Sequence, residues 1–255
     1  ISNPSGTISR IFMAEQAKFK ANVLMFDFGG CLDSSGLSMR NLFFNTFVDV
    51  KLLEEYDAPE FNEIFQDVDN EILKKGAATK LSLANLNQTS IKMLSKGLGV
   101  ENQLGQLAEV GRRILNVQRR FLETNRGVLE KLAGAGFTLG LVTNFYGNLK
   151  LVLDEFKLTP LFKFVIESYE FKKTKPDPAI FQAALAAAGV PAEECIFIGD
   201  SAEEDIQPAL ALGMQAFQVQ AKNGRHKNDY RQTRSPNATY LLSEITALPD
   251  LVQNP

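Results

Sequence analysis

Four groups of polar residues in this chain each follow a short apolar run. They are Asp27, Thr143 with Asn144, Lys175, and Asp200 with Ser201 and Asp205. The apolar runs predict buried strands, and parallel strands open onto one crevice at their carboxyl ends. We therefore expect the four groups to meet in that crevice. A carboxylate nucleophile, a hydroxyl, a cation and further carboxylates are typical of phosphoryl-transfer chemistry.

This chemistry gives most of these residues a role. Asp27 can act as the nucleophile, as aspartates do in enzymes that form an aspartyl-phosphate. Asp200 would repel Asp27 unless a divalent cation lay between them, and an oxygen-only site of this kind suits Mg²⁺. Lys175 and Thr143 would hold the transferring group and its charge. Taken singly, each residue has a simpler interpretation as a helix cap, a turn or a surface lysine, but that does not explain the joint arrangement.

The elements that must position these residues alternate between strands and helices. After a first strand at 23–26, we expect strands at 138–142, 164–166, 195–198 and 216–219. The helices expected between them span 148–156, 178–185 and a segment that begins near residue 204. This alternation predicts an α/β fold, with a Rossmann-like parallel sheet and helices on both faces.

A different pattern fills the chain between the first two strands. Apolar residues there recur at spacings of three and four, which predicts helices near 42–47, 57–76, 81–96 and 102–122, with a separate helix at 127–132. We interpret residues 34–125 as an inserted all-α domain. The α/β core domain then comprises residues 13–33 and 126–255, and residues 1–12 are interpreted as an appended or processed leader.

Composition narrows the class of protein. The 255-residue chain is 45% hydrophobic and 22% charged, with a formal net charge of -3, and this mild acidity argues against a nucleic-acid partner. The apolar runs are too short to cross a membrane. Cys31 and Cys195 fall in apolar contexts, as free thiols of a cytoplasmic protein would. The basic segment at 222–234 is interpreted as a solvated loop, with guidance of an anion as the alternative.

At the same polar residues the chain resembles the haloacid dehalogenase superfamily, whose members are mostly phosphatases. The matching segments are Asp27-Phe28-Gly29-Gly30, Thr143-Asn144, Lys175-Pro176-Asp177-Pro178, and Gly199-Asp200-Ser201 through Asp205. They are similar to the nucleophile motif, the second motif, the lysine motif and the acidic metal motif of the superfamily, in that order. The resemblance extends over residues 20–220 and implies a Mg²⁺-dependent phosphatase of a small phosphorylated substrate, acting through an aspartyl-phosphate on Asp27.

The resemblance also implies roles for individual residues. The metal ligands would be Asp27, Asp200 and the backbone carbonyl of Gly29. The phosphate would be bound by Thr143, Asn144 and Lys175. The metal site would be supported from behind by Asp205 and Ser201. Residues 34–125 would form a helical cap that closes over the site and excludes water.

One departure from the superfamily pattern bears on activity. Its phosphatases usually carry a second aspartate two residues after the nucleophile, which protonates the leaving group, whereas this chain has Gly29 there. General acid catalysis contributes about 10²- to 10⁴-fold, so activity should fall unless Asp33 or a cap residue substitutes. Three alternatives therefore stay open. They are a catalytically weak binding or regulatory protein, a dehalogenase, and a phosphonatase with Lys51, Lys74 or Lys80 as its Schiff-base lysine.

Overall fold

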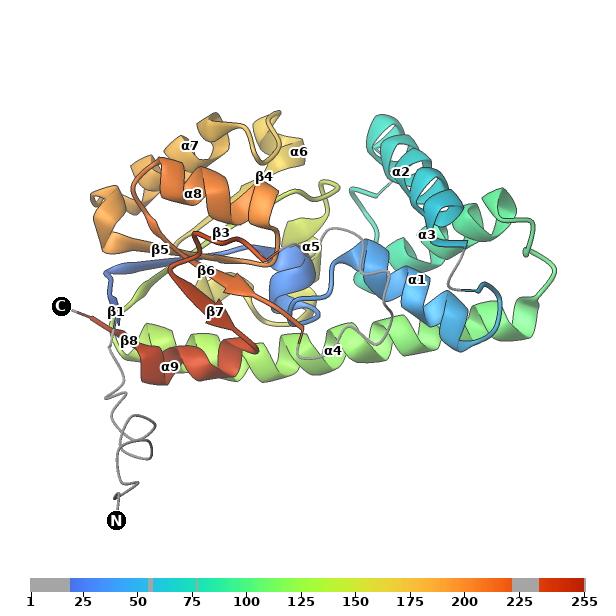
Figure 1. The fold of residues 1–255 in the computed structure, drawn as a ribbon, viewed down its shortest axis with the longest axis horizontal. Helices are drawn as coiled ribbons and strands as arrows, with labels where there is room; N and C mark the ends of the chain where they lie inside the picture. The colour runs from blue at the N-terminus through green and yellow to red at the C-terminus, as the bar shows by residue number, and fades with distance from the viewer. Residues whose placement is uncertain (1–18, 55–56, 77, 222–233, 255) are drawn as a thin grey trace, which may run out of the picture.

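The computed structural model describes residues 19–54, 57–76, 78–221 and 234–254 (Figure 1). The predicted leader and nearly all of the basic segment at 222–234 lie outside these residues. The main sheet consists of β2 (Val23–Phe26), β3 (Thr138–Thr143), β4 (Phe164–Glu167), β5 (Cys195–Gly199), β6 (Gln215–Val219) and β7 (Tyr240–Leu242). Two short strands, β1 (Phe19–Lys20) and β8 (Val252–Gln253), pair with each other.

The strand order of the main sheet places the predicted nucleophile at its centre. The order is β4-β3-β2-β5-β6-β7, and each neighbouring pair is parallel. In this register Phe26 is level with Leu141 on one side and Ile198 on the other. The residues that follow these positions therefore leave the sheet at the same edge, where ligands bind in parallel α/β folds.

Helices cover both faces of this sheet (Figure 1). One face packs against α7 (Pro178–Ala188) and α8 (Gln207–Ala211), and the other against α4 (Leu104–Gly134), α5 (Leu149–Glu155) and α9 (Leu248–Leu251). Along β2, Val23 and Met25 point to the first face and Leu24 and Phe26 to the second, as the alternation of a strand requires. The predicted α/β fold is confirmed.

Two predicted helices differ in detail from the structure. A short helix, α6 (Ser168–Phe171), precedes the Lys175 loop. The helix predicted to begin near residue 204 is divided into a π-type turn, Ala202–Ile206, and α8. Pro208 stands in the first turn of α8, where its missing N–H leaves no intrahelical hydrogen bond unmade. The turn brings Asp205 back toward the end of β5.

Between β2 and β3, the described residues form helices and turns. They include α1 (Met39–Asp49), α2 (Ala58–Lys75), α3 (Leu83–Gly97) and the first part of α4. As predicted, α2 ends at Gly76, which adopts a φ of 56° in the left-handed region. Phe43, Phe47 and Phe61 are completely buried among these helices. We refer to residues 34–125 as the cap.

The prediction of two separate helices at 102–122 and 127–132 is wrong. One helix of 31 residues, α4, runs through both segments and has a length of roughly 46 Å. Gly127 lies inside it, because an interior glycine costs only about 1 kcal/mol and packing at both ends exceeds that cost. Ile114 is buried in the cap and Leu129 under the sheet. The predicted domain boundary at 125/126 therefore falls within a continuous helix.

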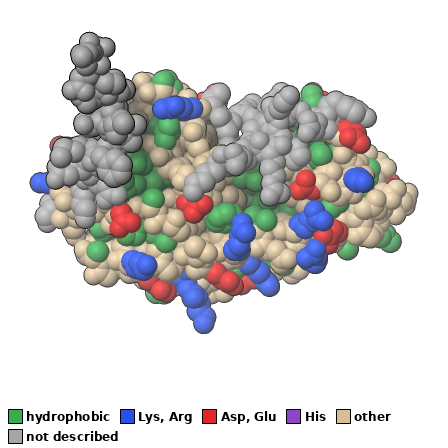
Figure 2. Space-filling view, turned by 60° about the horizontal axis from the view of Figure 1, so that its bottom comes forward, with side chains coloured by type: hydrophobic (Ala, Val, Ile, Leu, Met, Phe, Trp, Pro, Cys, Tyr) green, Lys and Arg blue, Asp and Glu red, His purple; other side chains and the backbone are tan. Residues whose placement is uncertain are grey.

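The face of the molecule along α4 carries basic and acidic side chains interspersed (Figure 2). Some of them form ion pairs one turn apart, such as Arg112 with Glu109 at 2.6 Å and Arg126 with Glu130 at 3.5 Å. Within the described part of the chain, we find no helix with both the length and the apolar character of a membrane span.

Candidate active site

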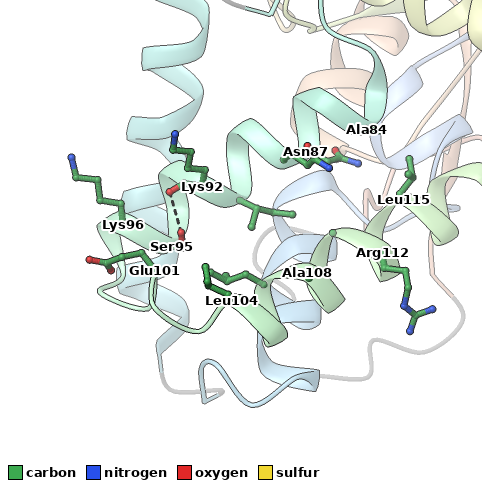
Figure 3. A pocket seen from close by; sticks show the side chains of 14 residues that line it. Ala84, Asn87, Lys92, Ser95, Lys96, Glu101, Leu104, Ala108, Arg112 and Leu115 are labelled. Carbon is green, nitrogen blue, oxygen red and sulfur yellow. Dashed lines mark hydrogen bonds between the residues drawn. The ribbon is translucent and has the colours of Figure 1, made fainter.

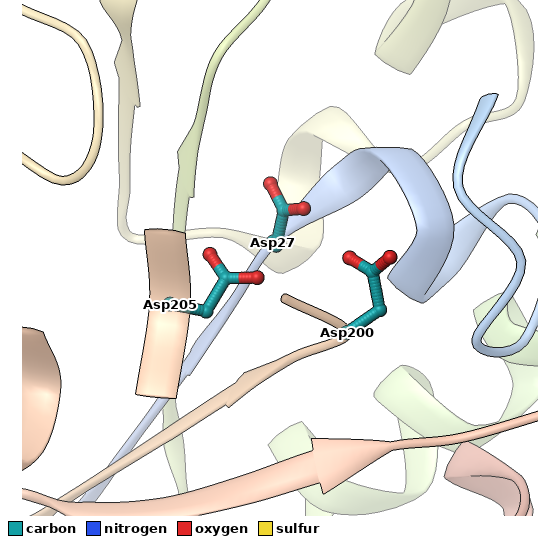
Figure 4. A group of neighbouring side chains, drawn as sticks. All are labelled: Asp27, Asp200 and Asp205. Atoms are coloured by element: carbon teal, nitrogen blue, oxygen red, sulfur yellow. The ribbon is translucent and has the colours of Figure 1, made fainter. Parts of the chain in front are cut away.

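Three carboxylates converge at the carboxyl edge of the sheet (Figure 4). Asp27 follows β2, Asp200 follows β5, and Asp205 comes from the turn after β5. One oxygen of each lies within 4.8 Å of the other two, and the residues are 5%, 6% and 0% exposed. We refer to Asp27, Asp200, Asp205 and the lysine described next as the acid cluster.

Lys175 is buried within this cluster rather than exposed at the surface. Its Nζ lies 2.7 Å from Oδ1 of Asp27 and 2.5 Å from Oδ1 of Asp205, and the residue is 4% exposed. Burial alone would lower the pKa of Lys175, but the carboxylates of Asp205 and Asp27 outweigh it and raise the pKa above its ordinary value. Lys175 is therefore a permanent cation beside the predicted nucleophile.

Asn144 fixes the loop that carries Lys175. Its Oδ1 accepts a hydrogen bond from the backbone N–H of Lys175 at 2.8 Å, and its Nδ2 donates to the Lys175 carbonyl at 3.1 Å. The same amide donates to Oε2 of Glu204 at 3.3 Å. Thr143, which precedes it, is 1% exposed and also lines the site. In this geometry the Asn144 side chain positions the lysine, so any phosphate contact would use the remaining donors of the loop.

Asp205 and Ser201 are held by the turn after β5. The Ser201 N–H donates to Oδ2 of Asp205 at 3.0 Å, while the Ser201 hydroxyl accepts from the N–H of Glu204 at 3.0 Å as a helix-type cap. Glycine is required at position 199, because a Cβ there would lie 2.4 Å from Oδ2 of Asp205. The turn therefore holds the Asp205 carboxylate in contact with the Lys175 ammonium.

Of the two glycines that follow Phe28, only Gly30 is required to be glycine by its surroundings. Gly30 has a φ of 80°, and a Cβ on it would lie 2.4 Å from Oδ2 of Asp200, so a larger residue would strain the backbone and displace that carboxylate. Gly29 has an ordinary φ of -73°, and a Cβ on it would meet nothing within 4 Å. The space beside Gly29 is therefore open, and sterics do not exclude a carboxylate side chain there.

The charges of the acid cluster suit a divalent cation. Three carboxylates face a single lysine ammonium, which leaves up to two negative charges uncompensated in a buried site. Burial, followed by the charges of Asp205 and Asp27, raises the pKa of Asp200 well above its ordinary value. Carboxylate and carbonyl oxygens are the ligands that Mg²⁺ prefers. The residues present therefore fit this ion.

A cavity of about 470 Å³ opens in front of the acid cluster, between the core and the cap. The core contributes the acid cluster together with Gly29, Thr143, Asn144, Tyr146 and Glu204. The cap contributes Met39, Arg40, Phe65, Gln66, Asp69 and Leu73. A volume of this size accommodates a small metabolite.

The sequence analysis did not identify three other polar residues that line this cavity, Arg40 and Asp69 of the cap and Tyr146 of the core, which we call the cap wall. The Tyr146 hydroxyl donates to Oδ1 of Asp69 at 2.7 Å, linking the core loop after β3 to α2. Arg40 donates from Nη2 to Oε1 of Gln66 at 3.0 Å and lies over the Phe65 ring, 5.5 Å from its centre. On sequence alone, Arg40 and Asp69 resemble the solvated positions of amphipathic helices.

Burial raises the pKa of Asp69 to about 6. The hydrogen bond from Tyr146 and the positive charge of Arg40 oppose this shift without cancelling it. The Tyr146 phenol has its own pKa raised, by burial and by the Asp69 carboxylate, so it remains a hydrogen-bond donor at neutral pH. A carboxyl group at the cavity surface is therefore poised between its two protonation states.

Asp33, a proposed substitute for the missing acid, lies behind the site. It is completely buried, and its Oδ1 accepts hydrogen bonds from the Gly30 N–H at 2.8 Å and the Ser34 hydroxyl at 3.0 Å. Its Oδ2 accepts from Nε2 of Gln118 at 3.1 Å, which connects the segment after β2 to α4. Burial raises the pKa of Asp33 to about 6. Asp33 does not line the cavity and serves to join the core to the cap.

A second, larger cavity of about 860 Å³ lies within the cap, between α3 and α4 (Figure 3). Ile91, Leu107 and Leu115 supply apolar surface, and Lys92 and Arg112 lie among its lining residues. None of the acid cluster borders it. Its size therefore does not make it the reaction site, because the convergent ionisable groups are elsewhere.

A parallel sheet covered on both faces, with a buried carboxylate and lysine cluster at its carboxyl edge, places the protein among α/β proteins with a candidate active site at the strand ends. A model of the haloacid dehalogenase-like hydrolase family matches residues 25–219, which is well over half of the chain. The chain therefore belongs to that family of hydrolases.

Curated relatives match in part. A segment of 105 residues is 32% identical to haloacid dehalogenase-like hydrolase domain-containing protein 3 of Danio rerio, covering 41% of this chain and 43% of that protein. A segment of 132 residues is 30% identical to glyceraldehyde 3-phosphate phosphatase of Methanocaldococcus jannaschii, covering 49% and 54%. A third, of 93 residues, is 34% identical to N-acylneuraminate-9-phosphatase of Mus musculus, covering 36% of each. The chain thus spans about half or less of these relatives' lengths.

Solved structures share the fold at lower sequence identity. A dehalogenase with an intermediate complex superposes with a TM-score of 0.58 at 16% identity, covering 91% of this chain and 97% of that one. The L-2-haloacid dehalogenase of Xanthobacter autotrophicus with chloropropionic acid covalently bound gives 0.53 at 14% identity, covering 91% and 98%. These likenesses establish the fold.

Proposed function

We propose that the protein is a Mg²⁺-dependent phosphatase of small phosphorylated metabolites that acts through an aspartyl-phosphate on Asp27. The observation that carries this proposal is the buried convergence of Asp27, Asp200 and Lys175 in front of a cavity of metabolite size. Partial relatives that are named as phosphatases of small metabolites support it.

Each residue has a defined task in this reaction. An oxygen of Asp27 attacks phosphorus as the bond to the leaving oxygen breaks. The Lys175 ammonium and the Thr143 hydroxyl face the phosphate oxygens and stabilise their charge in the transition state. Asn144 keeps Lys175 in place through its backbone. Water then attacks the aspartyl-phosphate, releases inorganic phosphate and regenerates the Asp27 carboxylate.

Mg²⁺ would be held by the carboxylates of Asp27 and Asp200 and by the carbonyl of Gly29. When bound, it neutralises charge on the phosphate and on the two aspartates. Asp205 and Ser201 would support this site, Asp205 through Lys175 and Ser201 through its hydrogen bond to Asp205.

The phosphonatase alternative lacks support at the cap lysines. Lys51, Lys74 and Lys80 are exposed, and none of them lines the cavity. The dehalogenase alternative keeps one specific observation in its favour, the absence of a carboxylate at Gly29, and dehalogenases of this superfamily work without a metal. Halide release from 2-chloropropionate in the presence of a chelator therefore distinguishes it.

The proposal is tested with p-nitrophenyl phosphate, whose good leaving group needs little help from an acid. We expect turnover that requires Mg²⁺, stops with a chelator and falls at least about 10³-fold in Asp27→Asn, because the nucleophile is lost. Asp67→Asn, an exposed substitution on α2, serves as the matched control and should retain activity. Turnover that persists in Asp27→Asn, or its absence in the wild type, would contradict the proposal.

A further inference from the structure

The proposed reaction lacks the proton donor that phosphatases of this superfamily carry two residues after the nucleophile, because Gly29 stands there. An alkoxide leaving group needs a proton as its bond to phosphorus breaks, and Gly29 offers only open space where a carboxyl group could stand. Asp33 has both carboxylate oxygens engaged in hydrogen bonds and is completely buried. The inference that follows rests on the proposed function.

Among the described residues, two carboxyl groups outside the acid cluster line the cavity, Asp69 and Glu204. Glu204 is exposed and lies on the core side, where its Oε2 accepts a hydrogen bond from Asn144. Asp69 is on α2, so it lines the same cavity as the acid cluster but from the cap, and a leaving group that extends from a phosphate at Lys175 into this cavity would approach it. Tyr146 fixes Oδ1 of Asp69, which leaves the other oxygen to carry a proton.

We propose that Asp69 is the general acid and base of this enzyme, supplied by the cap in place of the carboxyl group missing at Gly29, with Tyr146 as its positioning residue. The environment of Asp69 supports this assignment. Burial raises its pKa to about 6, so near neutral pH it retains a proton far more often than an ordinary aspartate does. The charged and titratable neighbours acting on it are Tyr146 and Arg40, and both favour the ionised form that must exist after the proton leaves.

The proton balance of the two steps is complete. In the first, Asp27 bonds to phosphorus, the phosphorus–oxygen bond to the leaving group breaks, and the proton of Asp69 moves to that oxygen to form the alcohol. In the second, a water oxygen bonds to phosphorus, the bond between phosphorus and the Asp27 oxygen breaks, and the Asp69 carboxylate takes one proton of the water while the other stays on the released phosphate. Asp69 ends protonated and Asp27 ionised, as both began.

Leaving-group dependence tests the proposal. Phenyl phosphate and p-nitrophenyl phosphate have similar size, but phenol leaves less readily and depends more on an acid. We expect Asp69→Asn to lower kcat/KM about 10²-fold for phenyl phosphate and only a few-fold for p-nitrophenyl phosphate. Asp67→Asn, two residues away and exposed, should change neither, and Glu204→Gln should affect the two substrates equally.

The open space beside Gly29 allows a rescue. Because a side chain fits there, Gly29→Asp in the Asp69→Asn background should restore turnover of phenyl phosphate by about tenfold or more. Tyr146→Phe removes a hydrogen bond that lowers the pKa of Asp69, so the pH above which phenyl phosphate turnover declines should rise. A merely structural role for Tyr146 would leave that pH unchanged.

The outcomes are distinguishable. A folded wild type that turns over neither substrate with Mg²⁺ would overturn the proposed function and this inference together. Turnover in the wild type with equal losses for both substrates in Asp69→Asn, or with no loss, would overturn only the role of Asp69. A loss selective for phenyl phosphate in Glu204→Gln instead would assign the proton to the core side.

Discussion

The acid cluster and the cap wall line one cavity, but they differ in burial and in how their side chains contact each other. The acid cluster is buried, and Lys175 bonds directly to two of its carboxylates within 2.7 Å. The cap wall is partly exposed; within it Tyr146 donates a hydrogen bond to Asp69, and Arg40 donates one to Gln66 beside it. The first arrangement holds paired charges in a buried site. The second leaves polar groups at the cavity surface, among them Asp69, whose pKa is raised to about 6.

The largest expected effect on stability comes from breaking the acid cluster. Lys175→Met leaves buried carboxylates without their cation, so the free energy of unfolding at neutral pH without metal should fall by about 3–5 kcal/mol. In the cap wall, Arg40→Met should change it by about 1 kcal/mol or less, because Arg40 is partly exposed. Denaturant unfolding measures both. Equal losses would remove the distinction between the two regions.

A smaller effect concerns the pH dependence of stability. The pKa of Asp33 is about 6 in the folded protein against an ordinary 3.8, so the folded state keeps a proton that the unfolded state has lost between these values. The contribution of this group to the free energy of unfolding should therefore fall by about 3 kcal/mol in total as pH rises from below 3.8 through 6, and become constant well above 6. Asp33→Asn should remove this contribution.

Denaturant unfolding at several pH values checks this prediction. Asp67→Asn is the control, because its exposed carboxyl group should leave the pH dependence as in the wild type. An unchanged pH dependence in Asp33→Asn would show that the network of Gly30, Ser34 and Gln118 keeps Asp33 ionised in the folded protein.

The smallest of these effects is stabilisation by Mg²⁺. An ion that binds only the folded state adds about 2.7 kcal/mol at a hundred times its Kd, so the Tm should rise with Mg²⁺ concentration. Asp200→Asn should abolish the rise, whereas Asp69→Asn should retain it. Thermal unfolding with and without a chelator measures this, and a rise that survives in Asp200→Asn would place the ion elsewhere.

The difference between the two regions also explains which residues of the site could be predicted from the sequence to lie together. Asp27, Thr143 and Asp200 follow buried strands, and the parallel register brings strand ends together, so their meeting was predictable from local patterns. Arg40 and Asp69 sit on amphipathic helices with no strand to align them. Their approach to Tyr146 depends on how α1 and α2 pack on the core, which no spacing along the chain encodes.

The error in α4 has the same origin. Gly127 and the polar residues near it read as a helix end, but a helix buried at both ends tolerates them because packing outweighs propensity. Burial of Lys175 was also invisible locally, since its two carboxylate partners come from distant parts of the chain.

The unbroken course of α4 limits how the cap and core can move. A hinge motion would need a flexible residue in each of the segments that connect the cap to the core. One of these segments is α4, a helix of roughly 46 Å whose Leu129 and Leu132 are buried under the sheet. Asn125, on the same helix, donates a hydrogen bond to the Leu32 carbonyl at 2.8 Å and so joins α4 to the segment that follows β2. A tilt of α4 would therefore displace its N-terminal end, in the cap, more than its anchored C-terminal part, which lies next to the segment after β2.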